Sequence, residues 1–284
     1  MKVLVTGAGG QLGYDVCREL ARRGIENRGA DVADFDITDA QAVRAYIGQY
    51  APDAVVHCAA YTAVDRAEED AARAFAVNEG GTRNIAAACA GTGAKMVYIS
   101  TDYVFGGEGE RFYEPDDAAA PLGVYGKSKY AGELAARSLV QKLFVVRISW
   151  VFGMNGGNFV KTMLRLAGTH ESLNVVGDQF GSPTYTADLA PLLCDMLAGE
   201  KYGTYHATNE GVCSWAEFAR EIFRLAGRQT QVRTVTTAEY GAKAPRPHNS
   251  RLSKACLDAA GFTRLPPWQD ALARYLRALA AEGK

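Results

Sequence analysis

"KVLVTGAGGQLG", residues 2–13, joins a short apolar run to three glycines that lie three residues apart. The apolar run, Lys2 to Val5, predicts a buried strand, and apolar residues from Leu12 onward recur at helical spacing up to Gly24. A strand, a glycine turn and a helix in this order are the fingerprint of a dinucleotide-binding βα unit. The stretch therefore predicts a Rossmann-type α/β fold.

Each glycine of this turn has its own physical role. Gly7 permits the tight turn, Gly10 lets the backbone approach a pyrophosphate, and Gly13 lets the helix pack close to the sheet. The helix N-terminus then offers free N–H groups and the positive end of its dipole to the phosphates. We therefore expect all three glycines to belong to a cofactor-binding site.

Further βα units follow the first one. Apolar runs at 53–62, 96–100 and 143–149 predict strands, and residues 78–95 predict a helix that ends at a glycine. The tetrapeptide TDAQ at 38–41 is typical of a capping box that opens another helix. Strands that alternate with helices predict a doubly wound parallel sheet, whose ligands bind beyond the carboxyl ends of the strands.

Two functional parts are expected along the chain. Residues 1–150 are expected to form a dinucleotide-binding domain that later segments near 183–200 complete. Beyond Trp150 the alternation becomes irregular and rich in loop sequence, so residues 151–284 are expected to form mainly a smaller α/β substrate-binding lobe with a discontinuous boundary. The final stretch, PPWQDALARYLRALAAEGK, predicts an amphipathic helix that packs against a core.

Asp31 follows the presumed second strand, 18 residues after Gly13. A carboxylate at this place accepts hydrogen bonds from the adenosine ribose and repels a 2′-phosphate, which favours NAD. Arg22, Arg23 and Arg28 are close in sequence, however, and a nearby arginine accommodates NADP. Because Asp31 also fits a solvated loop position, the choice between NADPH and NADH stays open.

Tyr125 and Lys129 are four residues apart, so on a helix both side chains project from one face. A free phenol has a pKa of about 10, too high for easy proton exchange at neutral pH. An ammonium group about 5 Å away, at an effective dielectric near 20, favours phenolate by about 3 kcal/mol. We therefore expect Lys129 to lower the pKa of Tyr125 and to hold the nicotinamide ribose.

Thr101 lies at the end of a predicted strand, 24 residues before Tyr125. Its hydroxyl is placed to orient a substrate carbonyl beside the phenol. Hydride then passes from a nicotinamide to the carbonyl carbon while Tyr125 gives the carbonyl oxygen a proton. The pair of Tyr125 and Lys129 alone is a weak signal, but the glycine turn upstream and Thr101 make it a specific one.

Composition and charge exclude several classes of protein. The 284 residues are 48% hydrophobic and 22% charged, with a net charge of −1, so no basic field points to nucleic acid or to an anionic membrane. No signal peptide and no run of about 18 apolar residues is seen, which predicts a cytoplasmic protein.

The four histidines lack the spacing of metal ligands. The six cysteines lie far apart and are expected to be reduced thiols, mostly in the core: Cys17, Cys58, Cys89, Cys194, Cys213 and Cys256.

These motifs resemble the extended short-chain dehydrogenase/reductases, which use the same glycine spacing, and within them the dTDP-4-dehydrorhamnose reductase family. The resemblance runs along nearly the whole chain and rests on TGAGGQLG, DFDITD, HCAAYTAVDRAEED, ISTDYVFGG, PLGVYGKSKYAGE, RISWVFGMNGGNFVKTML, VVGDQFGSPTYTADLA and APRPHNSRLS. It implies reduction of the 4-keto group of dTDP-4-dehydro-L-rhamnose with NADPH or NADH.

The resemblance also implies residue roles. Thr101, Tyr125 and Lys129 would form the catalytic set, and Asp102 would lie beside the substrate. The cofactor-binding residues carried over are Gly10, Gln11, Leu12, Asp31, Asp36, Ile37, Ala60, Tyr61 and Thr62. Some relatives hold a magnesium ion at a dimer contact, so Mg²⁺ and a homodimer are expectations from the family alone, without assigned ligands.

The residues themselves leave the contacts with the substrate open. Trp150, at a strand end, fits a contact with the sugar or the base as well as it fits ordinary packing. Arg246 lies between prolines and fits either a pair with the substrate diphosphate or a solvated surface position. Gln179 and Thr184 are weaker candidates of the same kind.

Three other functions compete with a reductase. Sugar-nucleotide 4,6-dehydratases carry Asp-Glu after the threonine, and Tyr103 replaces that glutamate here, so dehydration is not expected. An epimerase is not excluded by the motifs. A branch resembling the family regulates another enzyme without catalysis, and the presence of Thr101, Tyr125 and Lys129 argues against that role without excluding it.

Overall fold

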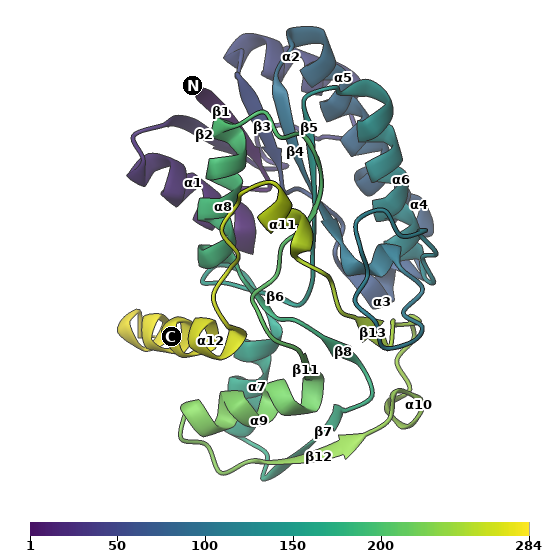
Figure 1. Ribbon diagram of the computed structural model, residues 1–284, viewed down its shortest axis with the longest axis vertical. Helices are drawn as coiled ribbons and strands as arrows, with labels where there is room; N and C mark the ends of the chain where they lie inside the picture. Colours follow the sequence, from purple (N-terminus) through teal and green to yellow (C-terminus); the bar gives the residue numbers. More distant parts are fainter. Residues whose placement is uncertain (284) are drawn as a thin grey trace.

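The computed structural model describes residues 1–283 and contains a six-stranded parallel sheet (Figure 1). Every strand pairing in this sheet is parallel. The strand order is β10 (Gly203–His206), β5 (Leu143–Ile148), β4 (Lys95–Thr101), β3 (Ala54–His57), β1 (Lys2–Thr6) and β2 (Glu26–Ala30). The predicted Rossmann-type sheet is therefore confirmed.

Helices cover both faces of the sheet because successive side chains of each strand point to opposite sides. Val3 and Val5 pack with one apolar cluster, whereas Leu4 between them packs with another. The first cluster includes α1 (Gln11–Arg22) and α8 (Thr186–Ala198). The second includes α2 (Ala40–Tyr50), α5 (Thr82–Thr92) and α6 (Val124–Leu139). This layering places α1 and α6 on opposite faces.

The glycine turn between β1 and α1 is as tight as the sequence predicts. Gly7 has a φ of +68°, and a Cβ built there would lie 2.7 Å from the Ala59 nitrogen. A Cβ on Gly13 would lie 2.2 Å from the carbonyl oxygen of Gly7, so α1 packs against the turn at a distance that only glycine permits. Gly24, at φ +69°, follows the end of α1.

The start of α2 differs from the predicted capping box. The N-cap is Asp39, whose carboxylate accepts hydrogen bonds from the nitrogens of Gln41 at 2.8 Å and Ala42 at 3.1 Å. Thr38 instead donates to the carboxylate of Asp36, also at 2.8 Å. The capping-box prediction is wrong because the carboxylate one residue later is the better-placed acceptor for the first-turn amides.

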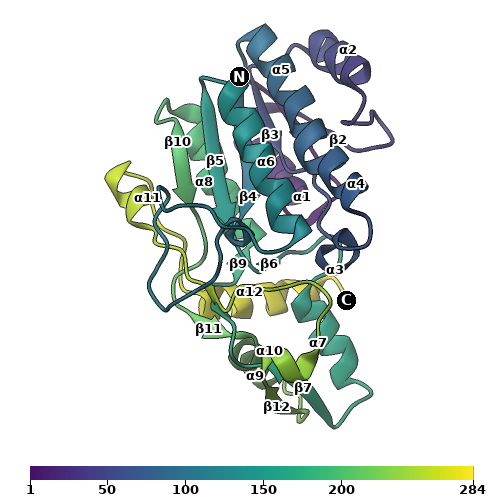
Figure 2. The ribbon, with the colours of Figure 1, turned by 90° about the vertical axis from the view of Figure 1, so that its right-hand side faces the viewer.

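The remaining elements include three small sheets and most of them gather below the main sheet in Figures 1 and 2. The short strands are β6 (Val151–Phe152) with β9 (Thr184–Tyr185), β7 (Ser172–Val176) with β12 (Gln231–Val235), and β8 (Phe180–Gly181) with β11 (Cys213–Ser214) and β13 (Asn249–Ser250). The helices are α3 (Val64–Ala67), α4 (Ala71–Phe75), α7 (Phe159–Ala167), α9 (Trp215–Leu225), α10 (Thr237–Tyr240), α11 (Ala255–Ala259) and α12 (Trp268–Ala281).

The amphipathic C-terminal helix α12 closes the core of this smaller part. Trp268, Leu272, Tyr275 and Leu279 are buried in one cluster with α7 and α9, as their spacing predicts. No helix within residues 1–283 is long and apolar enough to cross a membrane. All six cysteines are free.

Substitution Gly13→Ala tests the tight packing of α1. The added methyl group must displace the backbone of Gly7, so the free energy of unfolding should fall by about 1–3 kcal/mol or more. The matched control is Gly48→Ala, because Gly48 lies within α2 and a Cβ there meets no atom within 4 Å. The control should be neutral or stabilising by up to about 1 kcal/mol. Urea unfolding followed by circular dichroism measures both, and equal stability of the two variants would contradict the packing argument.

Candidate active site

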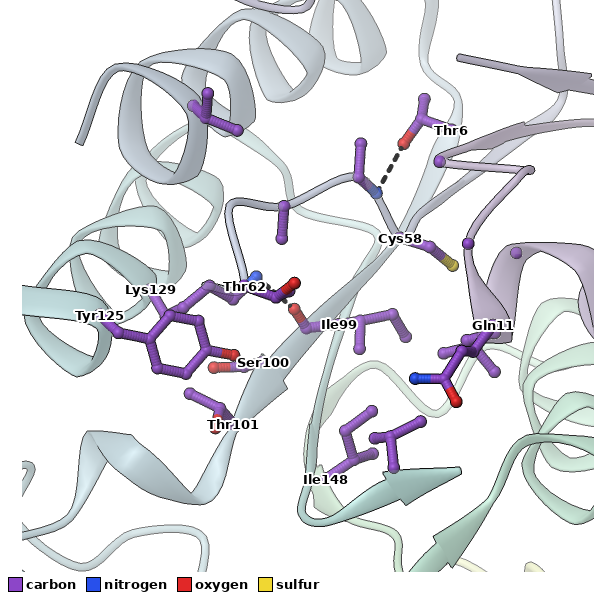
Figure 3. A pocket seen from close by; sticks show the side chains of 18 of the residues that line it. Thr6, Gln11, Cys58, Thr62, Ile99, Ser100, Thr101, Tyr125, Lys129 and Ile148 are labelled. Atoms are coloured by element: carbon purple, nitrogen blue, oxygen red, sulfur yellow. Dashed lines mark hydrogen bonds between the residues drawn. The ribbon is translucent and has the colours of Figure 1, made fainter. Parts of the chain in front are cut away.

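A cavity of about 750 Å³ opens at the carboxyl ends of the parallel strands. Its position agrees with the general rule for ligand sites in such sheets. Figure 3 shows Tyr125 and Lys129 entering it from α6 and Gln11 facing them from α1. The predicted residues that line it are Gly7, Gly10, Gln11, Leu12, Gly13, Asp31, Asp36, Ile37, Ala60, Thr62, Thr101, Asp102, Tyr125, Lys129 and Trp150.

The end of the cavity at α1 fits the pyrophosphate and ribose of a dinucleotide. No side chain caps α1, so its first-turn amides are available to an anion. The nitrogen of Gly9 donates to a carboxylate oxygen of Asp31 at 2.7 Å, which fixes that carboxylate beside the glycine turn. A Cβ on Gly9 would lie 2.9 Å from the same oxygen, so a larger residue would push the carboxylate away.

Lys129 is buried at the opposite end, with 3% of its surface exposed. Its Nζ donates to the carbonyl oxygen of Ile99 at 2.7 Å (Figure 3). The same Nζ lies 4.3 Å from the ring centre of Tyr98. Burial lowers the pKa of Lys129 to about 7, and nearby Glu133 and Cys58 oppose part of that shift.

The phenol of Tyr125 does not have the lowered pKa predicted from its sequence distance to Lys129. Desolvation raises the pKa of Tyr125 to about 12, although the neighbouring Thr101 hydroxyl opposes the rise. The prediction fails because desolvation penalises both charged forms, phenolate and ammonium, and sequence spacing carries no information on burial. In this structure Tyr125 is therefore a fully protonated phenol at neutral pH.

Thr101 binds a buried carboxylate. It ends β4, and its Oγ1 donates to Oδ1 of Asp102 at 2.9 Å. Asp102 is only 2% exposed, and its Oδ2 has no hydrogen-bond partner among the described residues. Burial raises the pKa of Asp102 to about 6, against the stabilising effect of Ser250 and Thr101 on the charged form.

A buried ion pair supports this helix face. Glu133 lies one turn after Lys129 on α6, and its carboxylate accepts two hydrogen bonds at 2.8 Å from the guanidinium of Arg147 on β5. Ser100 of β4 donates to the same carboxylate at 2.5 Å. Arg147 and Ser100 together hold the pKa of Glu133 below its usual value despite burial. The pair therefore ties α6 to two adjacent strands.

Comparisons with known proteins identify the family of this chain. A model of the RmlD substrate binding domain matches residues 1–281. The chain is 45% identical over 276 residues to the spore coat polysaccharide biosynthesis protein SpsK of Bacillus subtilis, covering 97% of each. It is 44% identical over 286 residues to dTDP-4-dehydrorhamnose reductase of Mycobacterium tuberculosis, covering 98% of this chain and 93% of that protein. The chain belongs to the dTDP-4-dehydrorhamnose reductase (RmlD) family.

The family assignment confirms the resemblance that the motifs indicated, and it extends to the fold. A crystal structure of dTDP-4-dehydrorhamnose reductase from Bacillus anthracis, in complex with NADP, superposes with a TM-score of 0.95. Its sequence is 44% identical, and the match covers 98% of this chain and 100% of that one. The α/β fold with its smaller companion sheets is thus the fold of the RmlD family.

Two predicted site residues are not among those that line the cavity. Arg246 forms an ion pair with Asp65 at 2.7 Å, although it remains close enough to Tyr103 to affect the pKa of that cavity residue. The backbone nitrogen of Tyr61 donates to the side chain of Asn78. The Tyr61 hydroxyl is buried without a hydrogen-bond partner among the described residues. Their roles in binding substrate and cofactor stay predictions.

The arginines considered for a 2′-phosphate do not line the cavity either. Arg22 and Arg23 lie at the far end of α1, where both bind Glu19. Arg28 packs its guanidinium over the ring of Tyr50, 4.2 Å from its centre. The arginine that lines the cavity is Arg73 on α4, which sequence distance from the glycine turn could not indicate.

Trp150 lines the cavity and also packs against protein. It has a φ of +50° and stacks on Trp215 with ring centres 3.7 Å apart, so the packing is observed, while a contact with the sugar or the base stays a prediction. No sequence period connects the two tryptophans, so the contact between Trp150 and Trp215 was not predicted.

The two weaker candidates for substrate binding form hydrogen bonds within the protein. Gln179 donates to Thr237 at 3.0 Å, and Thr184 donates to the Ser149 carbonyl oxygen at 2.6 Å.

Asn78 is a site-supporting residue that the sequence did not reveal. It is buried in the π-helix η1 (Ala76–Gly81), which precedes α5 where a continuous helix was expected. Its side chain accepts from the Tyr61 nitrogen at 2.8 Å and donates to the Tyr61 oxygen at 3.1 Å and to Ser128 at 2.9 Å. Asn78 thus fastens the cavity loop after β3 to α6, beside Lys129.

The described part of a single chain shows no cluster of side chains that could bind the magnesium ion expected from the family. Within residues 1–283, no group of three or more His, Cys, Asp or Glu side chains is arranged to hold a metal ion. His57, in the core, hydrogen-bonds with Thr6 at 2.7 Å and Thr82 at 3.1 Å, and burial lowers its pKa to about 3.

Arg147→Met tests the ion pair beneath the site. The variant leaves the Glu133 carboxylate buried without its cation, which should lower the free energy of unfolding by about 3–5 kcal/mol. Arg224→Met is the control, because Arg224 pairs with Glu221 at 2.6 Å on the exposed surface of α9. The control should change stability by no more than about 0.5 kcal/mol. Urea unfolding compares them, and similar losses in both would refute a special role for the buried pair.

Proposed function

We propose that this protein reduces the 4-keto group of dTDP-4-dehydro-L-rhamnose to give dTDP-L-rhamnose, with NADPH or NADH as the hydride source. The observation that carries the proposal is a half-buried phenol, Tyr125, that lines a dinucleotide-sized cavity together with Thr101 and Lys129. Relatives that match over nearly the full chain carry the name dTDP-4-dehydrorhamnose reductase. A dTDP-sugar is accordingly the proposed substrate.

The chemistry divides between the cofactor and the chain. The reduced nicotinamide, when bound, supplies the hydride that reaches the keto carbon. Tyr125 gives its phenolic proton to the keto oxygen, and Thr101 orients that oxygen by hydrogen bonding. A raised pKa suits this direction of reaction, because the donor stays protonated near neutral pH.

Lys129 has a positioning and electrostatic role in this proposal. The Ile99 carbonyl oxygen holds its Nζ at the floor of the cavity. There the amine can donate to a ribose hydroxyl of the cofactor and attract the negative charge that develops on Tyr125. An anionic ligand bound beside Lys129 would raise the pKa of its amine, since a nearby negative charge favours the protonated form.

The activity assay separates this function from its competitors. Purified protein is mixed with dTDP-4-dehydro-L-rhamnose and NADPH or NADH, and loss of the reduced-nicotinamide absorbance is followed while the product is identified by mass spectrometry and NMR. Stoichiometric oxidation with dTDP-L-rhamnose as product supports the reductase. Binding of cofactor without oxidation would indicate a regulatory subunit, and isomerised sugar without net oxidation would indicate an epimerase.

Tyr125→Phe removes the proposed proton donor. The turnover number should fall by about 10²–10⁴-fold, because general acid catalysis contributes that much, while the dissociation constant of NADPH stays close to that of the wild type. Tyr130→Phe is the control on the same helix, since the Tyr130 ring packs beside a separate cluster around Phe105 and Leu252. Steady-state kinetics and fluorescence titration of NADPH measure the two quantities. Undiminished turnover in Tyr125→Phe would remove this residue from the mechanism.

Asp31→Asn tests the choice of cofactor. The carboxylate beside Gly9 repels a 2′-phosphate, whereas an amide keeps an oxygen for the Gly9 nitrogen and loses the charge. The ratio of kcat/KM for NADPH to that for NADH should rise about tenfold, or about 1.4 kcal/mol. Asp34→Asn is the control, because Asp34 binds the Asp31 nitrogen at 2.8 Å but does not line the cavity. An unchanged ratio in Asp31→Asn would show that this carboxylate does not select the cofactor.

A further inference from the structure

The first side chain of α1 projects into the cavity from the glycine turn. Gln11 lines the cavity, and Figure 3 shows its amide nitrogen on the side that faces Tyr125 and Lys129. The hydrogen bond that this side chain makes within residues 1–283 joins its Oε1 to Nδ2 of Asn158 at 3.1 Å. The amide nitrogen of Gln11 is thus a donor left free by the described protein, beside the uncapped amides of the helix N-terminus.

Asn158 is held in one orientation by its neighbours. It is the N-cap of α7, and its Oδ1 accepts a hydrogen bond from the Lys161 nitrogen at 3.0 Å. A backbone N–H can only donate, so this contact fixes the place of the amide oxygen and turns Nδ2 the other way. Nδ2 then lies 3.0 Å from the Gly153 carbonyl oxygen, which can only accept, and 3.0 Å from Oη of Tyr275.

These contacts decide which end of the Gln11 amide faces the cavity. Tyr275 gives its own hydrogen to the Gly153 carbonyl oxygen at 2.9 Å, so its Oη accepts from Asn158. Because Nδ2 of Asn158 is a donor, only the oxygen of the Gln11 amide can be its partner. Nε2 of Gln11 therefore points away from Asn158 and towards the cavity.

The loop that carries Asn158 belongs to the smaller part of the molecule. It follows β6 and leads into α7, and a second asparagine of this loop, Asn155, donates to the Gly9 carbonyl oxygen at 2.6 Å. Tyr275, which is fully buried in the cluster around α12, holds the other side of Asn158. The orientation of Gln11 is thus set by a residue 147 positions away in the sequence.

We propose that Asn158 is a positioning residue, which aims the Gln11 amide so that its nitrogen donates to the pyrophosphate of the bound dinucleotide. This inference rests on the dinucleotide site of the proposed function. An ionised pyrophosphate can only accept hydrogen bonds, so its binding depends on which end of the amide it meets. With the nitrogen towards it, Gln11 adds a donor to those of the N-terminus of α1, whereas the oxygen would repel it.

Asn158→Asp tests this role because it changes which end of Gln11 faces position 158. An aspartate is also a good N-cap, since its carboxylate accepts from the Lys161 nitrogen as the amide oxygen does. A carboxylate cannot donate, however, so Gln11 should turn its nitrogen towards position 158 and its oxygen towards the pyrophosphate. The dissociation constant of NADPH should rise about 10–100-fold in fluorescence titration, as for loss of a hydrogen bond to a charged group.

A double variant separates the effect on Gln11 from direct repulsion by the new charge. Gln11→Ala alone should weaken NADPH binding about tenfold. In that background Asn158→Asp has no amide to turn, so it should change the dissociation constant by less than about threefold. A further loss as large as in the wild-type background would assign the effect to charge repulsion.

A ligand without the pyrophosphate gives a readout that a purely structural role would not separate. Adenosine 2′-monophosphate keeps the adenosine end of NADPH but has no 5′-phosphate, so its dissociation constant in calorimetry should be the same for the wild type and Asn158→Asp. Asn158→Ser is the milder variant: it keeps a capping oxygen, adds no charge and releases the Gln11 amide. It should weaken NADPH less than Asn158→Asp does and leave adenosine 2′-monophosphate unaffected, and urea unfolding checks that each variant is folded.

Three results would overturn the positioning role. They are NADPH dissociation constants unchanged in both variants of Asn158, an equal loss of affinity for adenosine 2′-monophosphate, and the full further loss in the double variant. Each leaves the proposed reductase standing, because wild-type protein would still bind NADPH and form dTDP-L-rhamnose. Failure of the wild-type protein to bind NADPH or NADH would instead remove the dinucleotide site and this inference together.

Discussion

The buried ion pair between Glu133 and Arg147 is the contact on which the candidate site depends. It joins α6 to β5 and, through Ser100, to β4, so the helix that carries Tyr125 and Lys129 cannot shift without separating two desolvated charges. Glu133 lies one turn beyond Lys129, and Lys129 one turn beyond Tyr125. Because these three residues are one turn apart on α6, the ion pair of Glu133 with Arg147 in the core also fixes the position of the Tyr125 phenol at the cavity.

The opposite wall of the cavity, formed by the glycine turn, is fixed by close backbone packing. A Cβ on Gly13 would overlap the Gly7 carbonyl oxygen, so α1 can lie this close to the turn only because position 13 has no side chain. The loop after β3 is held in turn by Asn78, which binds both backbone polar groups of Tyr61 and reaches Ser128 on α6. The two walls of the cavity are therefore linked through the sheet and through this asparagine, which makes the cavity a preformed one.

The sequence predicted the parts of this protein that are encoded locally. The glycine turn and the pairing of Tyr125 with Lys129 on one helix follow from spacing, which survives in any context. Contacts between distant segments did not follow: Arg246 meets Asp65, and Trp150 meets Trp215, across separations that carry no periodic signal. Motif resemblance supplied most of the predicted residues that line the cavity, because no local rule identifies them.

Electrostatics was the least predictable property, and the reason is physical. The Coulomb attraction between an ammonium and a phenolate can be estimated from helix geometry, but desolvation acts on both groups and reverses the expected shift of the Tyr125 pKa. A phenol that holds its proton firmly is an adequate donor only if the charge left behind is stabilised during the reaction and neutralised afterwards. Lys129 is placed to stabilise that charge, because the Ile99 carbonyl oxygen fixes its amine at the cavity. Desolvation likewise raises the pKa of Asp102, so a single physical cause shifts the pKa values of Tyr125, Lys129 and Asp102 around this cavity, in the direction that disfavours the charged form of each.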